Sequence, residues 1–254
     1  MKIFTKIMLI ASGIMAAIGV VCIVIACSMG LNWGNFKTLL SEGKFSINIE
    51  NGFFGIHLGD DDEISNETYY VSDEIVDLTV QYGAGELEIM YGDVEQIQIE
   101  TKDVINFSVE VDGKNLLIAA DLGANNRGDS SLKIVLPKDI QLANATLVLG
   151  ASAAKVADLR VVCMNIEVGA GQATLKNIDL KYLEAEVGVG ALLMELVGKQ
   201  SEYSYNVDCG IGAVTIGSNT YGGLGAETSV KVDNAVGQID VDCGIGEVKI
   251  TFTE

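Results

Sequence analysis

The sequence predicts an all-β protein whose short strands stack into coils of roughly 20 residues, a parallel β-helix-like β-solenoid, behind one N-terminal transmembrane helix. Three observations support this prediction. From residue 75 onward, apolar and polar residues alternate, as they do in half-buried strands. A glycine-containing segment recurs along this region at a nearly constant interval. Before it, a run of 30 residues from Ile7 to Phe36 carries no charge and is long enough to cross a bilayer.

Composition excludes several classes of protein. The 254 residues include 35 acidic side chains, 16 basic ones and a single His, which gives a formal net charge of -19. A nucleic-acid-binding protein needs Lys and Arg for its phosphate contacts, so this acidity argues against that class. The apolar share of 49% is too high for a disordered chain, and one Pro excludes Pro-rich and collagen-like architectures.

The N-terminal region is predicted to hold a short cytoplasmic tail, residues 1–6, and a transmembrane helix, residues 7–31. Such a helix would be about 37 Å long, enough to span a bilayer with some tilt. Trp33 follows it, where an interfacial aromatic residue belongs. The apolar run is longer than the roughly 7–15 residues of a secretory signal. We therefore expect an uncleaved single-pass anchor that attaches the protein to the cell membrane.

The topology of this anchor follows from the charges around it. Lys2 and Lys6 favour a cytoplasmic N-terminus, and Lys37 and Lys44 on the far side weaken that bias. We expect the C-terminal domain to be extracellular. The alternative is a lipoprotein anchored at Cys27, because the segment that ends there loosely resembles a bacterial lipobox.

Residues 32–74 show no sustained period and predict a linker. The acidic run at residues 60–63 lacks the alternating ligand spacing of an EF-hand, so it indicates a solvated turn. His57, the only His, is interpreted as a loop residue and not as a metal ligand or a base.

Residues 75–254 form the predicted β-solenoid domain. Its repeat is a four-residue motif with Ala, Val or Ile beside glycine, and the motifs begin at Tyr82, Leu149, Val168, Val187, Cys209, Asn234 and Cys243. The first glycine recurs after 19 residues twice, from Gly150 to Gly188, and then after 22. A fixed interval of about 20 residues is typical of stacked repeats.

Each motif is interpreted as a corner of a coil. Glycine can adopt a positive φ, which would let the chain bend sharply, and the apolar residue beside it would point inward. Stacked coils would hydrogen-bond as parallel ladders about 4.8 Å apart. We therefore expect Val168, Val187 and Cys209 to form one inward-facing column, with the first glycine of each motif stacked beside it.

A known family shares these features. Residues 131–152, which include Pro137, and the repeats at residues 166–180 and 207–217 resemble the bacterial "putative adhesin" domain of unknown function. The resemblance covers residues 75–254. It implies a glycine-punctuated β-solenoid, often carried behind an N-terminal membrane segment, with an adhesive function and no catalytic residues to transfer.

No catalytic, cofactor-binding or metal-binding residue is predicted. Glu184 and Glu186 lie about 7 Å apart on one strand face, a spacing that would suit two-carboxylate glycoside hydrolysis. Neither has an apolar neighbour on that face, so a solvated strand face is favoured. Cys163, Cys209 and Cys243 show no CxxC or Cys/His cluster of a zinc site. Cys209 and Cys243 are expected to be small core residues.

The function that fits these predictions is that of a non-enzymatic, membrane-anchored bacterial surface protein. Its β-solenoid would present a face that binds a protein or glycan partner, and the process it would serve is adhesion. Two alternatives remain open at the level of the sequence. One is an envelope-stress sensor or a regulator of a membrane partner, and the other is a carbohydrate-active β-solenoid enzyme. The sequence gives no support for a nucleic-acid partner or a homo-oligomer.

Overall fold

The computed structural model describes residues 45–50, 53–58, 64–120, 122–123 and 130–253. Helical structure among them is limited to the single 3-10 turn η1 (Gln200–Glu202). No helix within these described ranges is long and apolar enough to cross a membrane. The predicted tail, the predicted transmembrane helix at residues 7–31, Cys27 and the acidic run at residues 60–63 all lie outside them.

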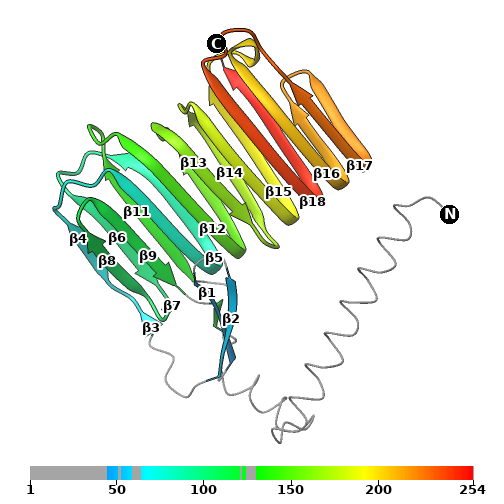
Figure 1. The fold of residues 1–254 in the computed structure, drawn as a ribbon. Coiled ribbons are helices and arrows are strands. Elements are labelled where there is room, and N and C mark those ends of the chain that lie inside the picture. The colour runs from blue at the N-terminus through cyan, green and yellow to red at the C-terminus, as the bar shows by residue number, and fades with distance from the viewer. Residues whose placement is uncertain (1–44, 51–52, 59–63, 121, 124–129, 254) are drawn as a thin grey trace, which may run out of the picture.

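The rest of the described chain consists of strands and their connections (Figure 1). In chain order the strands are β1 (Phe45–Glu50), β2 (Phe53–Leu58), β3 (Ile64–Ser65), β4 (Thr68–Val71), β5 (Asp77–Gly92), β6 (Ile97–Lys102), β7 (Val104–Ile105), β8 (Ser108–Asp112), β9 (Asn115–Ala120), β10 (Leu122–Gly123), β11 (Ser131–Pro137), β12 (Leu142–Ala157), β13 (Val161–Val168), β14 (Gln172–Ile178), β15 (Tyr182–Val197), β16 (Tyr203–Ile216), β17 (Asn219–Val230) and β18 (Gly237–Thr253).

Thirteen of these strands form one sheet. Its order is β17-β16-β18-β15-β13-β12-β5-β11-β6-β4, and β14, β9 and β8 attach at the side. Pairing is parallel throughout the middle of the sheet, from β5 through β12, β13, β15 and β18 to β16. The antiparallel pairs lie toward its ends, at β17 and at β6 and β4. The described part of the chain is all-β, and the parallel pairing of β12 with β13 and β14, and of these with β15, is the stacking that the 19-residue interval predicts.

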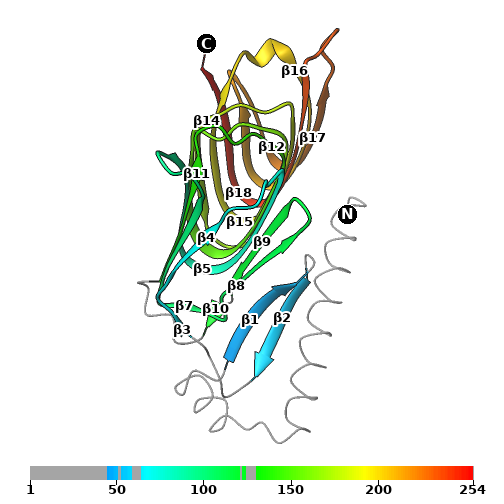
Figure 2. The same ribbon diagram turned by 90° about the vertical axis from the view of Figure 1, so that its left-hand side faces the viewer.

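The long strands each bend at a glycine motif, so that the two halves of one strand belong to two different faces of the stack. In β12, residues 144–149 pair with the first half of β5 and with β13, whereas residues 153–157 pair with the second half of β5 and with β14. We name the strand halves before the bend, with β9 and β13, the first arm, and the halves after it, with β11 and β14, the second arm. In the antiparallel strand β17 the order is reversed, so the half after its bend belongs to the first arm. Figure 2 shows these bent strands nested one behind another.

The core lies between the two arms. Alternate residues of each strand are buried, and in β15 the buried side chains of the first arm, such as Leu183 and Val187, have their counterparts on the second arm in Leu192 and Met194. Burying one such side chain completely stabilises the fold by about 1.5–3 kcal/mol. A single coil has too little apolar surface to close a core, so the stack as a whole stabilises each member.

The inward-facing column predicted at the corner is confirmed, with one additional member. Val168 pairs with Val187, Val187 with Cys243, and Cys243 with Cys209. All four side chains are buried, and Leu149 continues the column on β12. Cys209 and Cys243 are free thiols in the core, as expected from their place in the motif.

Cys243 enters this column because the chain order and the spatial order differ at the C-terminal end. After β15 the chain forms β16, returns as the antiparallel strand β17, and then places β18 between β15 and β16. In Figure 1 the red strand β18 lies between the yellow β15 and the orange β16. β16, which forms the hairpin with β17, is therefore separated from β15 by β18, and β18 pairs in parallel with both β15 and β16.

Two motif assignments are corrected by this topology. The segment from Asn234 to Gly237 is not a corner, because residues 231–236 form the connection into β18 and Asn234 has a φ of 59°. A further corner, which is not among the predicted motifs, occurs in β17 at residues 223–225, where Leu224 pairs with Ile211. Its middle residue is Leu, whereas the predicted motif has Ala, Val or Ile at that place.

The positive φ predicted for the corner glycines is found at Gly85, Gly212, Gly223 and Gly225 but not at every corner. Gly188, Gly190 and Gly210 do not have positive φ values. A Cβ atom on Gly190 would instead lie 2.1 Å from the carbonyl oxygen of Gly171, and one on Gly188 would lie 2.9 Å from that of Gly169. Glycine is needed here because the backbones of neighbouring coils approach too closely for any side chain.

Strands β1 to β4 lie within residues 32–74, for which the sequence predicts a linker. β1 pairs antiparallel with β2 and β10, and β4 pairs antiparallel with β6 at the edge of the large sheet. The sheet therefore begins before Ile75. β4 is four residues long, which is too short for an alternating pattern to stand out.

Candidate functional site

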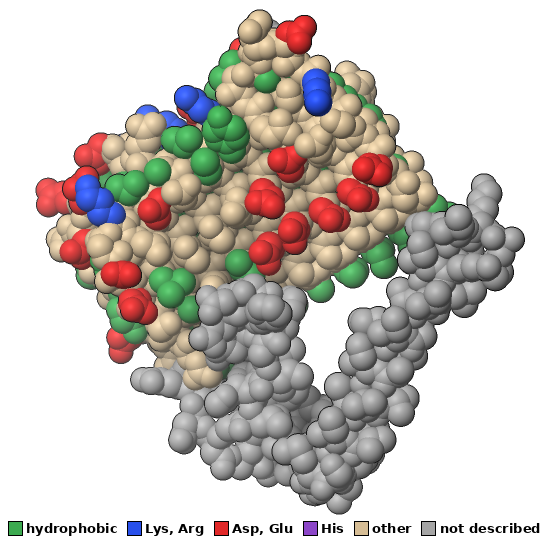
Figure 3. Space-filling model, in the orientation of Figure 1, with side chains coloured by type: hydrophobic (Ala, Val, Ile, Leu, Met, Phe, Trp, Pro, Cys, Tyr) green, Lys and Arg blue, Asp and Glu red, His purple; other side chains and the backbone are tan. Residues whose placement is uncertain are grey.

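The outer face of the first arm carries two rows of acidic side chains. The first acidic row has one member on each of five adjacent strands, and these members pair in register: Glu167, Glu186, Asp242, Asp208 and Glu227. The second acidic row, two residues earlier along β15 and β18, consists of Glu184 and Asp240. Figure 3 shows both rows crossing the strands on the face turned toward the viewer.

The position of these rows is fixed by the corners. Glu167, Glu186, Asp208 and Asp242 each lie two residues before the first glycine of a motif. A residue at that position faces outward, because its neighbours on either side face the core. Strand stacking then places the carboxylates about 4.8 Å apart from one strand to the next.

The acidic rows have no basic counterparts. Among the described residues, no Lys or Arg forms an ion pair with any member of the two rows. Ion pairs do form elsewhere in the domain: Lys155 pairs with Glu86 on the second arm, and Lys114 pairs with Glu74 at 2.7 Å. The negative charge of the first arm is thus left for solvent ions or for a partner.

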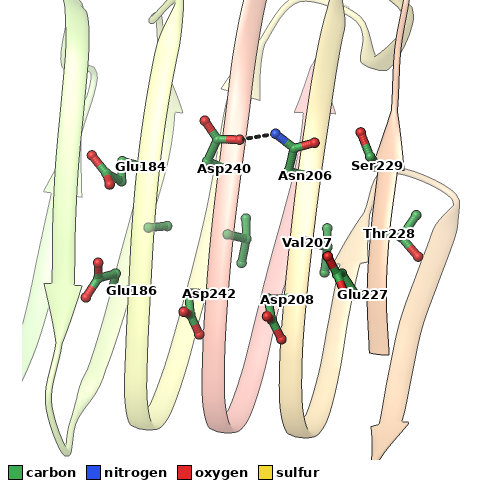
Figure 4. Close-up of a pocket in the computed structure, with 12 residues that line it drawn as sticks. Glu184, Glu186, Asn206, Val207, Asp208, Glu227, Thr228, Ser229, Asp240 and Asp242 are labelled. Carbon is green, nitrogen blue, oxygen red and sulfur yellow. Dashed lines mark hydrogen bonds between the residues drawn. The ribbon is translucent and has the colours of Figure 1, made fainter. Parts of the chain in front are cut away.

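A shallow open hollow of about 500 Å³ lies over this face (Figure 4). Both acidic rows except Glu167 line it, together with Asn206, Thr228 and Ser229. Asn206 donates a hydrogen bond from its side-chain amide to Asp240 at 2.7 Å, and Gln238 donates another at 2.9 Å. These two bonds hold the Asp240 carboxylate in place.

Glu167, on β13, lies at the end of the first acidic row that is nearer the middle of the sheet. Partial burial raises the pKa of its carboxyl group, and the negative charges of Glu186 and Glu184 raise it further. Burial is the larger cause of this shift, and the stacking of like charges at one strand spacing adds to it.

A row of exposed apolar side chains borders the acidic face at the bend. We name it the corner ridge, and its members are Val189, Ile245, Ile211 and Leu224, exposed by 57%, 51%, 44% and 76%. They pair in register across β15, β18, β16 and β17. Hydrophobic side chains line the lower edge of the molecule beside the acidic row in Figure 3. The middle residues of these motifs therefore point outward, whereas the sequence predicted that they point inward.

The structure places the residues that the sequence analysis singled out. Glu184 and Glu186 lie on the exposed face of β15, as predicted, but they belong to a larger array that sequence reasoning missed. That array could have been found by aligning the residues before each glycine. Cys163 is partly exposed and is a free thiol. His57, interpreted from the sequence as a loop residue, lies on strand β2, where it pairs with Ser46. Across the part of the chain that the structure describes, no three His, Cys, Asp or Glu side chains are arranged to hold a metal ion.

Comparison with protein families identifies one match. Residues 57–217 match the family described as the N-terminal domain of toast_rack, DUF2154. The match begins within the segment predicted as a linker and ends at the turn between β16 and β17. Comparison with the curated proteins finds no match.

The chain is also similar to solved structures, among them those of two bacterial proteins. A "putative cell adhesion protein" from Clostridium sporogenes ATCC 15579 superimposes with a TM-score of 0.55 at 18% identity, covering 75% of this chain and 100% of that one. A "putative adhesin" from Bacteroides fragilis NCTC 9343 gives a TM-score of 0.34 at 12% identity, covering 74% of this chain and 97% of that one. The TM-score of 0.55 shows that the chain shares its fold with the Clostridium sporogenes protein.

Proposed function

The chain belongs to the family of the toast_rack N-terminal domain, DUF2154, and on that premise we propose that it is a non-enzymatic, membrane-anchored surface protein whose first arm is an interaction face used in adhesion. The observation that carries this proposal is the regular outer face of the first arm. It combines two rows of carboxylates without ion-pair partners among the described residues and an exposed apolar ridge along its border.

The regularity of the acidic face supports binding over catalysis. A two-carboxylate hydrolase needs one carboxyl group that stays protonated and one that stays ionised, and it creates this difference with different surroundings. Glu186, Asp242 and Asp208 occupy equivalent positions on three adjacent strands, so their surroundings are alike. Repeated, equivalent charges suit the recognition of an extended cationic surface.

The anchor supports presentation at the cell surface. The uncharged run from Ile7 to Phe36 is long enough for one membrane span, and residues 32–44 would separate this span from β1. The adhesive role is supported by the fold that the chain shares with the Clostridium sporogenes protein, which is named a cell adhesion protein.

The proposal is tested first by the location of the domain. Protease added to intact cells should degrade residues 45–254 of the full-length protein, and the protein should remain in the membrane fraction. Protection in intact cells with degradation after lysis would contradict surface presentation.

The adhesive role is tested by attachment of cells that display equal amounts of protein. The triple variant Glu186→Gln, Asp242→Asn, Asp208→Asn should reduce attachment, whereas the triple variant Glu88→Gln, Glu195→Gln, Glu247→Gln on the second arm should not. Equal attachment by both variants and the wild type would contradict the assignment of the interaction face to the first arm.

A regulator of a membrane partner is the second candidate function. The corner ridge favours it, because a contiguous exposed apolar row is typical of protein–protein contact. In that case the first arm would bind a protein in the same membrane, and deleting the partner would change signalling without changing attachment.

A further inference from the structure

The corner ridge is an unusual feature for a protein surface. Single exposed apolar residues are ordinary, but here four lie side by side on adjacent strands, each between or beside corner glycines. Leu224 on the edge strand β17 is the most exposed, at 76%. The glycines on either side carry no side chains, so the ridge stands free of its neighbours. Exposure of such an apolar row to water is unfavourable in free energy, and a partner that covers the row would remove this cost.

The charge beside the ridge restricts what that partner can be. In each of the four strands the ridge residue lies three positions from a member of the first acidic row, as in Val189 and Glu186 or Ile245 and Asp242. Three residues of strand span about 10 Å. The occupant must therefore present an apolar stripe and, about 10 Å to one side, positive charges in a parallel row.

The spacing of the ridge favours a helix over an extended segment. Ridge residues recur about every 4.8 Å, so the row from Val189 to Leu224 is about 14 Å long. Three turns of an α-helix rise about 16 Å and present one apolar residue per turn toward the ridge. Same-face side chains of a β-strand recur about every 6.7 Å, so three steps would overshoot the ridge by about 6 Å. With a diameter of about 10–12 Å, a helix on the ridge also brings flanking Lys or Arg side chains over the acidic row.

We propose that the corner ridge and the first acidic row together bind a basic amphipathic α-helix of a partner protein, which lies across β15, β18, β16 and β17. The apolar stripe of the helix covers Val189, Ile245, Ile211 and Leu224, and its Lys and Arg side chains pair with the acidic row. This inference rests on the proposed function, in that it specifies the partner of the same face. Electrostatic attraction speeds association, and burial of the ridge slows dissociation.

The proposal is tested with the full-length chain in phosphatidylcholine nanodiscs, with empty nanodiscs as the blank. The probe is a synthetic 18-residue peptide of Leu and Lys, with Leu at helical spacing on one face, and its Kd is measured by fluorescence anisotropy. A peptide of the same composition with the Leu positions scrambled is the matched control. We expect the amphipathic peptide to bind at least about tenfold more tightly than the scrambled one.

Variants at the ridge separate apolar docking from charge attraction. The double variant Val189→Ser, Ile245→Ser should raise the Kd of the amphipathic peptide about tenfold. Val236 is a matched control, since it is exposed by 58% but lies on the connection before β18, and Val236→Ser should leave the Kd unchanged. Equal binding by wild type and the ridge double variant would overturn the proposal.

Variants of the acidic row distinguish a failure of this inference from a failure of the proposed function. Glu186→Gln, Asp242→Asn and Asp208→Asn in one protein should weaken binding and flatten its salt dependence, because fewer charges remain to be screened. If these changes abolish binding of both peptides while the ridge changes have no effect, the acidic interaction face stands and the helix site is overturned. If neither peptide binds the wild-type protein, both proposals are overturned.

Discussion

At the scale of single residues, the corner glycines determine how closely the coils stack. The second glycines of four neighbouring motifs illustrate this: a Cβ on Gly171, Gly190, Gly246 or Gly212 would lie 2.0–2.1 Å from a backbone carbonyl oxygen of the adjacent coil. Real Cβ atoms do not approach oxygen so closely, so any side chain here forces the coils apart. At these four positions the requirement for glycine is thus one of space, whereas the equivalent position on β12 is occupied by Ser152.

Gly190→Ala is expected to destabilise the protein by more than about 1 kcal/mol, because the added methyl group collides with the backbone of the preceding coil. Gly188→Val should also exceed about 1 kcal/mol, since its Cβ lies 2.9 Å from the Gly169 carbonyl oxygen and its γ-methyl groups need further room. The measurement is denaturant unfolding of the full-length protein in detergent. Glu186→Gln on the exposed face is the control and should cost less than about 0.5 kcal/mol. Equal costs for the three variants would refute this account of the corners.

The buried thiols provide a second prediction at this scale. Cys209 and Cys243 are fully buried and adjacent, and burial, with the neighbouring Cys209, raises the pKa of Cys243 to about 11. Because the thiolate is the reactive form, both residues should resist iodoacetamide at pH 8 in the folded protein and react after unfolding. Cys163 is partly exposed and should react first. Peptide mapping by mass spectrometry distinguishes the three, and rapid native labelling of Cys243 would contradict the packing.

Glu167 provides a prediction about pH. Its pKa is raised above the ordinary 4.5 by burial and by Glu186 and Glu184, so folding favours its protonated form. The stability that this group contributes is full below its unfolded pKa and is lost as pH rises through its folded pKa. Glu167→Gln should therefore stabilise the protein at pH 7, by less than about 1 kcal/mol because the group is partly solvated, and the gain should vanish near pH 4.

Glu86 is the matched control for that experiment. A hydrogen bond from Lys155, and its charge, lower the pKa of Glu86, so its contribution is present above its unfolded pKa and is lost as pH falls through its folded pKa. Glu86→Gln should accordingly not stabilise the protein at pH 7. Stabilisation of the same size by both substitutions would show that the effect does not come from the stacked carboxylates.

At the scale of the strands, the insertion of β18 holds the C-terminal end together. β18 is the one strand that hydrogen-bonds to both β15 and β16, and its first half completes both the buried column and the acidic row. Without it, the β16–β17 hairpin would lose its neighbour on the stack. Isolated hairpins are marginally stable in water.

Deletion of residues 237–254 should therefore release the β16–β17 hairpin while β5 and β12 stay folded. Hydrogen exchange of the full-length and truncated proteins, both in detergent, tests this directly. The amides of Val207 and Val214 in β16 should lose protection, whereas those of Val80 and Leu147 should keep it. Continued protection of β16 in the truncated protein would contradict the role given to β18.

The strands and corners were predictable because they depend on local patterns. The alternation around Leu183–Val187 and the glycine spacing identify coils and their bends without knowledge of the partner strands. The outward direction of Val189 and Ile245 was not predictable in this way, because it depends on how tightly the glycine backbones of neighbouring coils meet. The acids two residues before each glycine do form a local pattern, but their order in the acidic row depends on β18 lying between β15 and β16, a long-range choice of pairing that no local pattern specifies.

At the scale of the whole molecule, charge is separated between the two arms. The chain has a formal net charge of -19, and the first arm concentrates acids without ion-pair partners among the described residues, while Lys155 neutralises Glu86 on the second arm. A field of one sign on one face attracts cationic partners and repels anionic ones, and it is screened by salt. The domain therefore has one strongly acidic side, which the corner ridge borders.

Site-specific photo-cross-linking in living cells tests this claim most directly. A photo-reactive amino acid is placed in the full-length protein at Ile245 on the corner ridge or, as the control, at Val236, which is similarly exposed but lies away from it. We predict a discrete adduct from Ile245 and none from Val236, and loss of that adduct when Glu186, Asp242 and Asp208 are neutralised. Adducts of equal yield from both positions, or an Ile245 adduct that survives neutralisation of the acidic row, would contradict the account.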